Sequence, residues 1–237
     1  MKKIGILGGM SYQSTLHYYN GINQQVNHAL GGNNTADLII TSGNFQVIED
    51  LMNDNNWDEI TRLLTINALG MKYQGASELV IATNTIHKLA DKIEAGSGLP
   101  IIHIADCVAK EITKAGIKRI GLLGTRPTMK ESFIKDKLIN HGLEVFVPNY
   151  EDDIDLIHNI IFKELCVGKT TNEAKKYFLK VIQYLQKKYK VEGIILGCTE
   201  IDLLINSNDT NIPLFDTTQA HINEISKIII DSVKIKK

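Results

Sequence analysis

Short runs of aliphatic and β-branched residues alternate along the chain with longer segments whose apolar positions recur every three to four residues. Alternation of this kind is typical of parallel sheets whose strands are joined by crossover helices. The pattern therefore predicts an α/β protein. The predicted strands are residues 3–8, 37–41, 78–82 and 100–103 in the first half, and residues 118–123, 144–147, 192–196 and 212–215 in the second.

The clearest helical pattern lies near residues 172–186. Its apolar positions follow the i, i+3, i+4, i+7 spacing of one helix face, and Thr170 with Glu173 has the spacing of a capping box. We expect this face to be core and not a functional site. Its residues are Ala174, Tyr177, Phe178, Val181, Ile182 and Leu185.

The two halves of the chain resemble each other. IGILGGM at residues 4–10 is echoed by IGLLGTR at 120–126, VIATNTI at 80–86 by ILGCTEI at 195–201, and LPIIHIAD from Leu99 by IPLFDTTQ from Ile212. Three echoes at nearly one offset indicate a duplication. The expected fold is two similar α/β domains, each with a mainly parallel four-stranded sheet flanked by helices.

The duplication also predicts a domain organisation. The first domain is expected to comprise residues 1–104 plus 211–237, so that the C-terminal helix packs on it, and the second domain residues 105–210. Two such domains related by a pseudo-two-fold axis would both turn the carboxyl ends of their strands to a shared interdomain cleft, where open α/β sheets bind ligands. The active site is expected there.

Composition narrows the function classes. The 237 residues carry a formal net charge of −1, with both signs scattered along the chain, which argues against nucleic-acid binding. The apolar run after the basic N-terminus stops at Ser11, too short for a signal peptide, and no run reaches the roughly 20 apolar residues of a membrane span. We expect a cytoplasmic protein with a small-molecule ligand and no membrane partner.

Cys107, Cys166 and Cys198 form no CxxC pair and are odd in number, which argues against disulfides and a cysteine zinc site, so no metal is expected. The Gly8-Gly9 turn is not part of a GxGxxG motif and no GxxxxGK[ST] follows, so nucleotide binding is not expected. A cysteine that matters here would act as a thiol, whereas Cys107 and Cys166 are interpreted as inert core residues.

Two equivalent turns carry the candidate chemistry. Thr83 follows the apolar run that ends at Ala82, and Cys198 follows the run that ends at Gly197. Where a strand gives way to a helix, free backbone N–H groups and the helix dipole bind carboxylates and lower the pKa of a thiol. The sequence thus predicts an activated thiol at Cys198, with an inert buried cysteine as the alternative interpretation.

GGMS at 8–11, NTIH at 84–87, IGLLGT at 120–125 and LGCTEI at 196–201 resemble the motifs of the aspartate/glutamate racemase family. The resemblance covers essentially the whole chain. It implies a two-domain α/β pseudo-dimer, no pyridoxal phosphate or other cofactor, a homodimer, and a two-base mechanism in which cysteines act on opposite faces of the α-carbon.

The chain departs from that pattern at Thr83, where most family members have the first cysteine. A threonine hydroxyl is too weak an acid to exist as a resting alkoxide. Thr83 can donate a proton to the carbanion, relay one from water, or hold the α-carboxylate of the substrate. A helix N-cap is the structural alternative.

The resemblance and the needs of the reaction suggest the remaining roles. Donors that stabilise a doubly charged intermediate are expected from the segment after Thr83, from Thr125 and from the residue after Cys198. Glu200 would tune Cys198 or accept the ammonium group, and Lys169 would bind an acidic side chain, whereas Gln46 stands where aspartate-selective members tend to have arginine. The expected substrate-binding residues are Met10, Gln46, Asn84, Thr85, Thr125, Lys169, Thr199 and Glu200.

His87 lies one turn beyond Thr83. It can orient catalytic groups, although a half-buried histidine with a purely structural role is the simpler interpretation.

Three functions follow from these residues. The first is racemisation of aspartate or glutamate, with a wider amino-acid range left open by Gln46. The second is decarboxylation of malonate-type acids, which needs only one proton donor. The third, from a different class, is an amino-acid-binding sensor with a degenerate site, for which Thr83 would mark the loss of a catalytic base.

Overall fold

The computed structural model describes residues 1–234 and divides into two compact units. The first contains Met1–His103 and the segment from His221 onward, and the second contains Ile104–Ala220. The return to the first unit therefore falls at His221 and not near residue 211. The reason is the strand at Leu214–Asp216, which pairs with the second sheet and keeps this segment in the second unit.

The first unit has a three-stranded parallel sheet of order β2-β1-β3. Three predicted strands are present within one residue of their expected ends, but the expectation of a fourth at residues 100–103 is wrong. Leu79 donates to the Pro100 carbonyl at 2.8 Å and accepts from Ile102 at 2.9 Å, and the chain then enters a helix at Ile104, so only an isolated bridge forms. The strands are β1 (Lys3–Gly8), β2 (Asp37–Ser42) and β3 (Glu78–Ile81).

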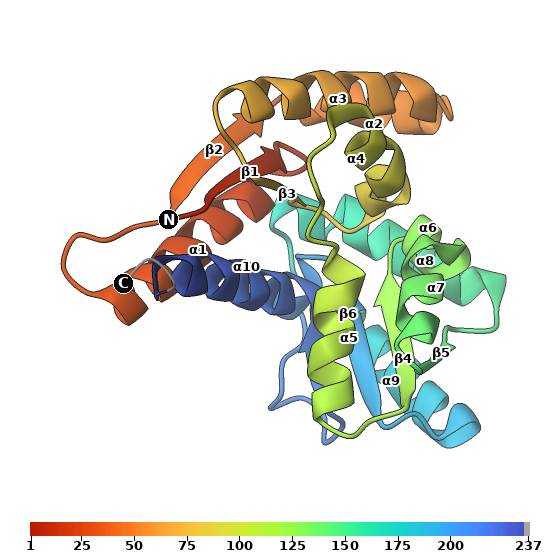
Figure 1. Ribbon diagram of the computed structural model, residues 1–237. Coiled ribbons are helices and arrows are strands. Elements are labelled where there is room, and N and C mark those ends of the chain that lie inside the picture. The colour runs from red at the N-terminus through yellow and green to blue at the C-terminus, as the bar shows by residue number, and fades with distance from the viewer. Residues whose placement is uncertain (235–237) are drawn as a thin grey trace. The chain divides into compact units, whose positions relative to one another are not determined.

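Helices cover both faces of this sheet (Figure 1). Ile4, Ile6 and Val80 pack with Tyr18 of α1 and Ile222 of α10 on one face, which confirms that the C-terminal helix packs on the first unit. Leu7, Leu79 and Ile81 pack against α2, α3 and α4 on the other face. The helices are α1 (Tyr12–Leu30), α2 (Phe45–Asn53), α3 (Trp57–Tyr73), α4 (Ala90–Ser97) and α10 (Thr217–Lys234), with the 3-10 helix η1 at Thr85–Leu89.

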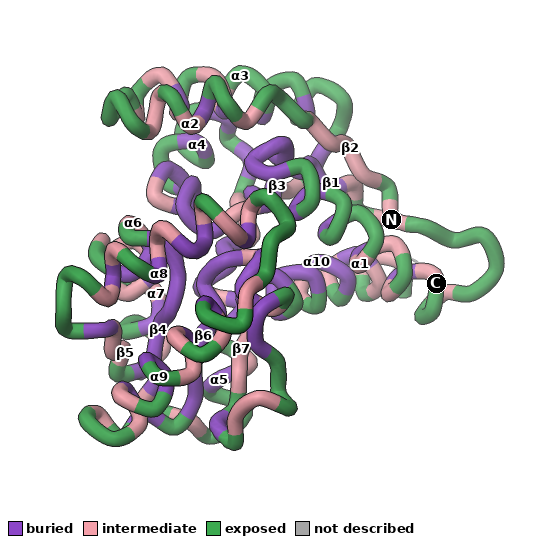
Figure 2. The backbone as a smooth tube through the Cα atoms, turned by 180° about the vertical axis from the view of Figure 1, so that it is seen from behind, coloured by how far each residue is buried: buried purple, intermediate pink, exposed green. Residues whose placement is uncertain are grey.

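The second unit has a four-stranded parallel sheet of order β5-β4-β6-β7, as expected. Its central strands are buried along their length (Figure 2). The strands are β4 (Arg119–Gly124), β5 (Glu144–Phe146), β6 (Gly193–Gly197) and β7 (Leu214–Asp216). The helices are α5 (Ile104–Lys114), α6 (Arg126–Lys130), α7 (Ser132–Asn140), α8 (Glu151–Lys163) and α9 (Asn172–Tyr189), with 3-10 helices η2 (Leu165–Val167) and η3 (Ile201–Leu203).

The predicted helix near residues 172–186 is α9, and its apolar face is core. The cap, however, is Thr171 and not Thr170, since the Thr171 hydroxyl accepts a hydrogen bond from the Ala174 N–H at 3.2 Å. The same hydroxyl donates to Glu164 at 2.9 Å, and this second partner explains why Thr171 takes the capping position.

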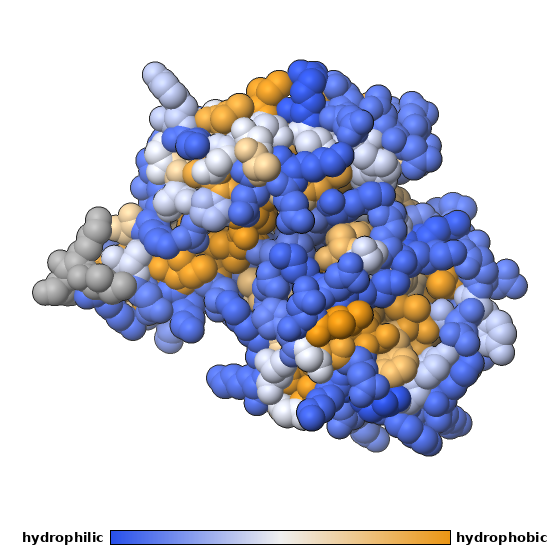
Figure 3. All heavy atoms as spheres, turned by 45° about the vertical axis from the view of Figure 1, so that its right-hand side comes forward, coloured by the Kyte–Doolittle hydropathy of each residue, from blue (hydrophilic) through white to orange (hydrophobic). Residues whose placement is uncertain are grey.

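No helix among residues 1–234 is long and apolar enough to cross a bilayer. The face drawn in Figure 3 is largely hydrophilic, with apolar residues reaching the surface in separate patches. Patches of this kind are ordinary for a folded chain.

Candidate active site

The turn after β3 holds Thr83 by its backbone. The Ser14 hydroxyl of α1 donates to the Ala82 carbonyl at 2.8 Å, and His87 Nδ1 lies 2.7 Å from the Thr83 carbonyl oxygen. Because a carbonyl only accepts, His87 carries its proton on Nδ1. Side-chain donors thus fix two successive carbonyls, while the Thr83 side chain remains half-exposed.

No α-helix starts directly after Thr83, contrary to expectation. The chain bends at residues 82–84 and then forms η1, for which Asn84 is the cap residue without a side-chain capping bond. Asn84 and Thr85 are both buried beside Thr83. The N-cap alternative for Thr83 is therefore wrong.

The neighbouring glycine turn after β1 is held by Thr15. Its Oγ1 accepts from the Gly9 N–H at 2.8 Å and donates to the Ser11 carbonyl at 2.9 Å. Gly9 has φ +81°, and a Cβ there would lie 2.6 Å from the Gly43 nitrogen, so only glycine fits. Since β1 and β3 are paired, this turn lies next to the Thr83 turn.

A pocket of about 200 Å³ opens beside this glycine turn. Met10, Val47 and Leu63 give it an apolar wall, and Asn44 and Asn67 are its polar side chains. No charged side chain is among the described residues that line it.

Gln46 lies near that pocket in sequence but is exposed on α2 and does not line it. Its side-chain amide donates to Asp50 Oδ1 at 2.8 Å, one helical turn away. Residue 46 is the position at which the resemblance implies arginine in aspartate-selective proteins. In this chain it is a neutral amide that is already hydrogen-bonded to a carboxylate.

The second candidate turn follows β6. Cys198 is buried and its thiol donates to Glu200 Oε2 at 3.0 Å, while the Thr199 hydroxyl donates to the same oxygen. Burial, followed by the negative charge of Glu200, raises the pKa of the Cys198 thiol well above its ordinary value.

The expectation of a helix dipole that lowers the pKa of Cys198 is therefore wrong. Only the three-residue 3-10 helix Ile201–Leu203 follows the turn, and it is too short to offer the aligned peptide dipoles of an α-helix. The adjacent carboxylate acts in the opposite direction.

Thr125 joins this second turn. Paired strands β4 and β6 bring Gly124 level with Gly197, and Thr125, directly after Gly124, is buried with its hydroxyl 3.0 Å from that of Thr128. Lys169 is exposed in the loop between η2 and α9.

The residues divide between the two units. Met10, Thr83, Asn84 and Thr85 gather at the carboxyl ends of β1 and β3, and four others gather at the carboxyl ends of β4 and β6: Thr125, Cys198, Thr199 and Glu200. Sequence reasoning missed Ser14 and Thr15. The only hint to them was the hydroxyl-rich segment after the glycine turn.

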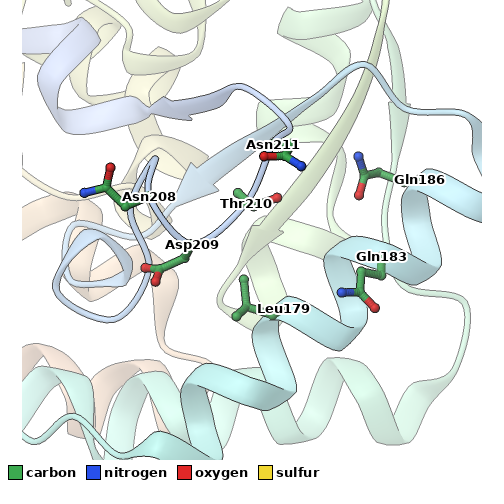
Figure 4. A pocket seen from close by; sticks show the side chains of 7 residues that line it. All are labelled: Leu179, Gln183, Gln186, Asn208, Asp209, Thr210 and Asn211. Carbon is green, nitrogen blue, oxygen red and sulfur yellow. The ribbon is translucent and has the colours of Figure 1, made fainter.

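A second pocket, of about 290 Å³, lies in the second unit (Figure 4). It is lined by Leu179, Gln183 and Gln186 of α9 and by residues 208–211 of the loop that leads into β7. This loop enters the amino end of β7, whereas Cys198 follows the carboxyl end of the parallel strand β6. The pocket is therefore separate from the cysteine turn.

Within residues 1–234, no three histidine, cysteine, aspartate or glutamate side chains are grouped so as to hold a metal ion.

Comparison with known proteins decides the family. Residues 7–225 match the family model described as Asp/Glu/Hydantoin racemase. The chain belongs to this racemase family.

Several known proteins are similar to this member of the racemase family. The broad specificity amino-acid racemase RacX of Bacillus subtilis is 22% identical over 91% of this chain and 92% of its own. A solved structure from Yersinia pestis, described as a candidate Asp/Glu racemase, is 43% identical with a TM-score of 0.91, covering 97% of this chain and all of that one (100%). A solved aspartate racemase homologue from Pyrococcus horikoshii is 34% identical with a TM-score of 0.83, covering 97% and 99% of the two chains.

A mutant of arylmalonate decarboxylase shares the fold alone, at 11% identity and a TM-score of 0.55 over 97% of this chain and 93% of that one.

Proposed function

We propose that this chain racemises aspartate and glutamate, with a substrate range that extends to uncharged amino acids. The observation that carries the proposal is the Cys198 thiol bonded to Glu200 in the turn that duplicates the Thr83 turn. Membership of the racemase family supports the reaction class.

Glu200 supplies the base that a high-pKa thiol needs. The proton on Sγ passes to Glu200 Oε2 along the existing hydrogen bond, and the thiolate then takes the α-proton of the substrate. The S–H bond breaks as an O–H bond forms, and the C–H bond breaks as a new S–H bond forms. Buried backbone amides and hydroxyls at both turns stabilise the resulting carbanion, so the proposal uses no pyridoxal phosphate.

Thr83 acts on the opposite face of the α-carbon. A threonine hydroxyl is a proton donor and not a resting base, so it delivers a proton to the carbanion and is reprotonated by water. Glu200 gives up the proton it took from Sγ to the hydroxide that this leaves, which restores both groups for the next turnover. The enantiomer that presents its α-proton to Cys198 is therefore the favoured starting substrate. The opposite direction needs a base at the Thr83 face and is slower.

The absence of charged side chains around the pocket of the first unit, among the described residues that line it, supports a wide substrate range. The pocket beside Met10 is lined by apolar side chains and by the side-chain amides of two asparagines, and Gln46 is hydrogen-bonded to Asp50. Lys169, which matches a lysine of the family in the resemblance described above, is proposed to attract an acidic side chain of the substrate. The Bacillus subtilis relative is described as having broad specificity, which supports the same range here.

The test is proton NMR of L- and D-aspartate, L- and D-glutamate and L- and D-alanine in deuterium oxide, with chiral chromatography of the same samples. We expect the unmodified protein to exchange the α-proton and to invert the configuration. Cys198→Ala should do neither. Binding of the amino acids without any exchange in the unmodified protein would support the sensor. Release of carbon dioxide from a malonate-type acid, with no amino-acid exchange, would support the decarboxylase.

A further inference from the structure

Three histidines gather in the interior of the first unit, and the reaction described above does not use them. His87, His103 and His221 are 2%, 7% and 0% exposed. The ring centroid of His87 lies 4.6 Å from that of His103 and 5.7 Å from that of His221, with edge-on geometry in both pairs. They come from η1, from the segment before α5 and from α10.

The hydrogen bonds of His221 define its state. Its Nε2 lies 2.7 Å from the Ile102 carbonyl and must donate, so its Nδ1 accepts from the Tyr18 hydroxyl at 2.8 Å. The neutral form with the proton on Nε2 satisfies both ring nitrogens. Burial, together with the neighbouring His87, lowers the pKa of His221 to about 3, which is consistent with this neutral form.

His87 has the opposite tautomer because its Nδ1 must carry a proton to bond the Thr83 carbonyl. Its Nδ1–H donates to the Thr83 carbonyl at 2.7 Å, and its ring is packed against two other imidazoles. The ring therefore cannot swing away from Thr83 without unpacking His221 of α10, which is held by the Ile102 carbonyl before α5 and by Tyr18 of α1. Two helices far apart in the sequence thereby fix the orientation of one catalytic peptide.

We propose that His87 is a positioning residue for Thr83, and that His221 and Tyr18 fix the ring of His87 for this task. The inference rests on the proposed racemase function and adds a residue that touches neither substrate nor reacting atoms. Its consequence is specific to one face. Loss of the His87 donor impairs the proton transfer at Thr83 and leaves the Cys198 side intact.

Two amide substitutions distinguish positioning from simple packing. In His87→Asn the side-chain nitrogen occupies the place of Nδ1 and still reaches the Thr83 carbonyl. In His87→Gln the nitrogen lies one bond further out, at the place of Nε2, and the donor is lost. Both variants put a neutral amide into the same cavity, so they share the same general effect on stability. The exposed His17→Gln serves as a further control.

The kinetic readout compares inversion with exchange that retains configuration, using the enantiomer that presents its α-proton to Cys198. We expect His87→Gln to lower the inversion rate about 10- to 100-fold, because correct placement of a proton donor is worth that much. Exchange with retention and KM should change less than threefold. His87→Asn should recover most of the inversion rate. Equal losses in the two variants, or a parallel fall of exchange and inversion, would overturn the proposal.

A spectroscopic readout is independent of turnover. Long-range proton–nitrogen NMR should find His87 as the Nδ1–H tautomer and His221 as the Nε2–H tautomer. The amide nitrogen of Asn84, which shares its peptide bond with the Thr83 carbonyl, should shift in His87→Gln and stay in place in His87→Asn. An Nε2–H tautomer at His87 would overturn the positioning role. Failure of the racemase proposal would appear instead as no exchange in the unmodified protein, with these NMR results unchanged.

Discussion

Cys198 Sγ lies 3.0 Å from Glu200 Oε2, and both groups are buried. A carboxylate that accepts the S–H bond of a thiol favours the protonated thiol, because forming the thiolate would place two negative charges side by side. In the resting protein Cys198 is therefore a proton donor. It becomes a base only when Glu200 takes its proton.

The alkylation of Cys198 should depend on pH in a way that reflects this pairing. Because burial and Glu200 raise the pKa of the thiol, the midpoint of its alkylation profile should lie above ~8.5, the pKa of an ordinary cysteine. Peptide mass spectrometry after timed iodoacetamide treatment from pH 6 to 10 measures Cys198 separately from Cys107 and Cys166. A rate that levels off below pH 8 would contradict the raised pKa.

Glu200→Gln should separate the acidity of Cys198 from its catalysis. Loss of the neighbouring negative charge lowers the pKa of the thiol, so alkylation should move to lower pH. Racemisation at neutral pH should nevertheless fall by about 10² to 10⁴, the contribution of a positioned general base. Glu173→Gln makes the same change at an exposed position on α9 and is the matched control. Faster racemisation in Glu200→Gln would show that Glu200 is only an inhibitory charge.

Thr83→Cys should make the two directions of turnover more alike. A thiol at this position can act as both acid and base, so the slow direction, which needs a base at the Thr83 face, should gain the most. Thr83→Ala removes the donor and should lower inversion in both directions. Chiral chromatography of initial rates from each enantiomer measures the ratio. A Thr83→Cys variant as inactive as Thr83→Ala would place Thr83 outside the proton-transfer path.

Gln46→Arg should shift preference toward an acidic side chain, provided that the new guanidinium is not captured by Asp50. In the native chain Gln46 donates to Asp50 at 2.8 Å, so the informative variant is Gln46→Arg with Asp50→Asn, and Asp50→Asn alone is the control. The ratio of kcat/KM for aspartate to that for asparagine should rise about tenfold, equivalent to ~1.4 kcal/mol. An unchanged ratio would mean that residue 46 does not face the substrate side chain.

His221 should make the fold sensitive to mild acid. Its pKa is lowered to about 3 in the folded chain and returns to near 6.5 on unfolding, so the unfolded state binds the extra proton. The contribution of neutral His221 to the free energy of unfolding is fully present above about pH 6.5. It falls as the pH is lowered toward 3, and the loss is ~2 kcal/mol at pH 5. Urea denaturation at pH 7 and pH 5 should show a smaller loss in His221→Gln than in the native chain or in His17→Gln. An equal loss in all three would assign the acid sensitivity to other groups.

The strands, the duplication and the two candidate turns follow from the amino-acid sequence alone. These features depend on local pattern, since an apolar run between turn residues favours a buried strand and a duplicated run carries its turn with it. That is why the sequence pattern was sufficient to single out the turns of Thr83 and Cys198, and why β1, β2 and β3 lie within a residue of their predicted bounds. Residues 100–103 are the exception, because the chain enters a helix at Ile104 and only an isolated bridge forms.

The state of the groups at those turns, in contrast, depends on the folded chain. Tyr18 and His221 are 203 positions apart in the chain, and no local pattern predicts their hydrogen bond or the tautomers that follow from it. The acidity of Cys198 was predicted with the wrong sign because it depends on burial and on the side chain of Glu200, both set by packing. Periodicity records which residues are buried, whereas a pKa and a tautomer depend on which polar atoms meet there once the chain has folded.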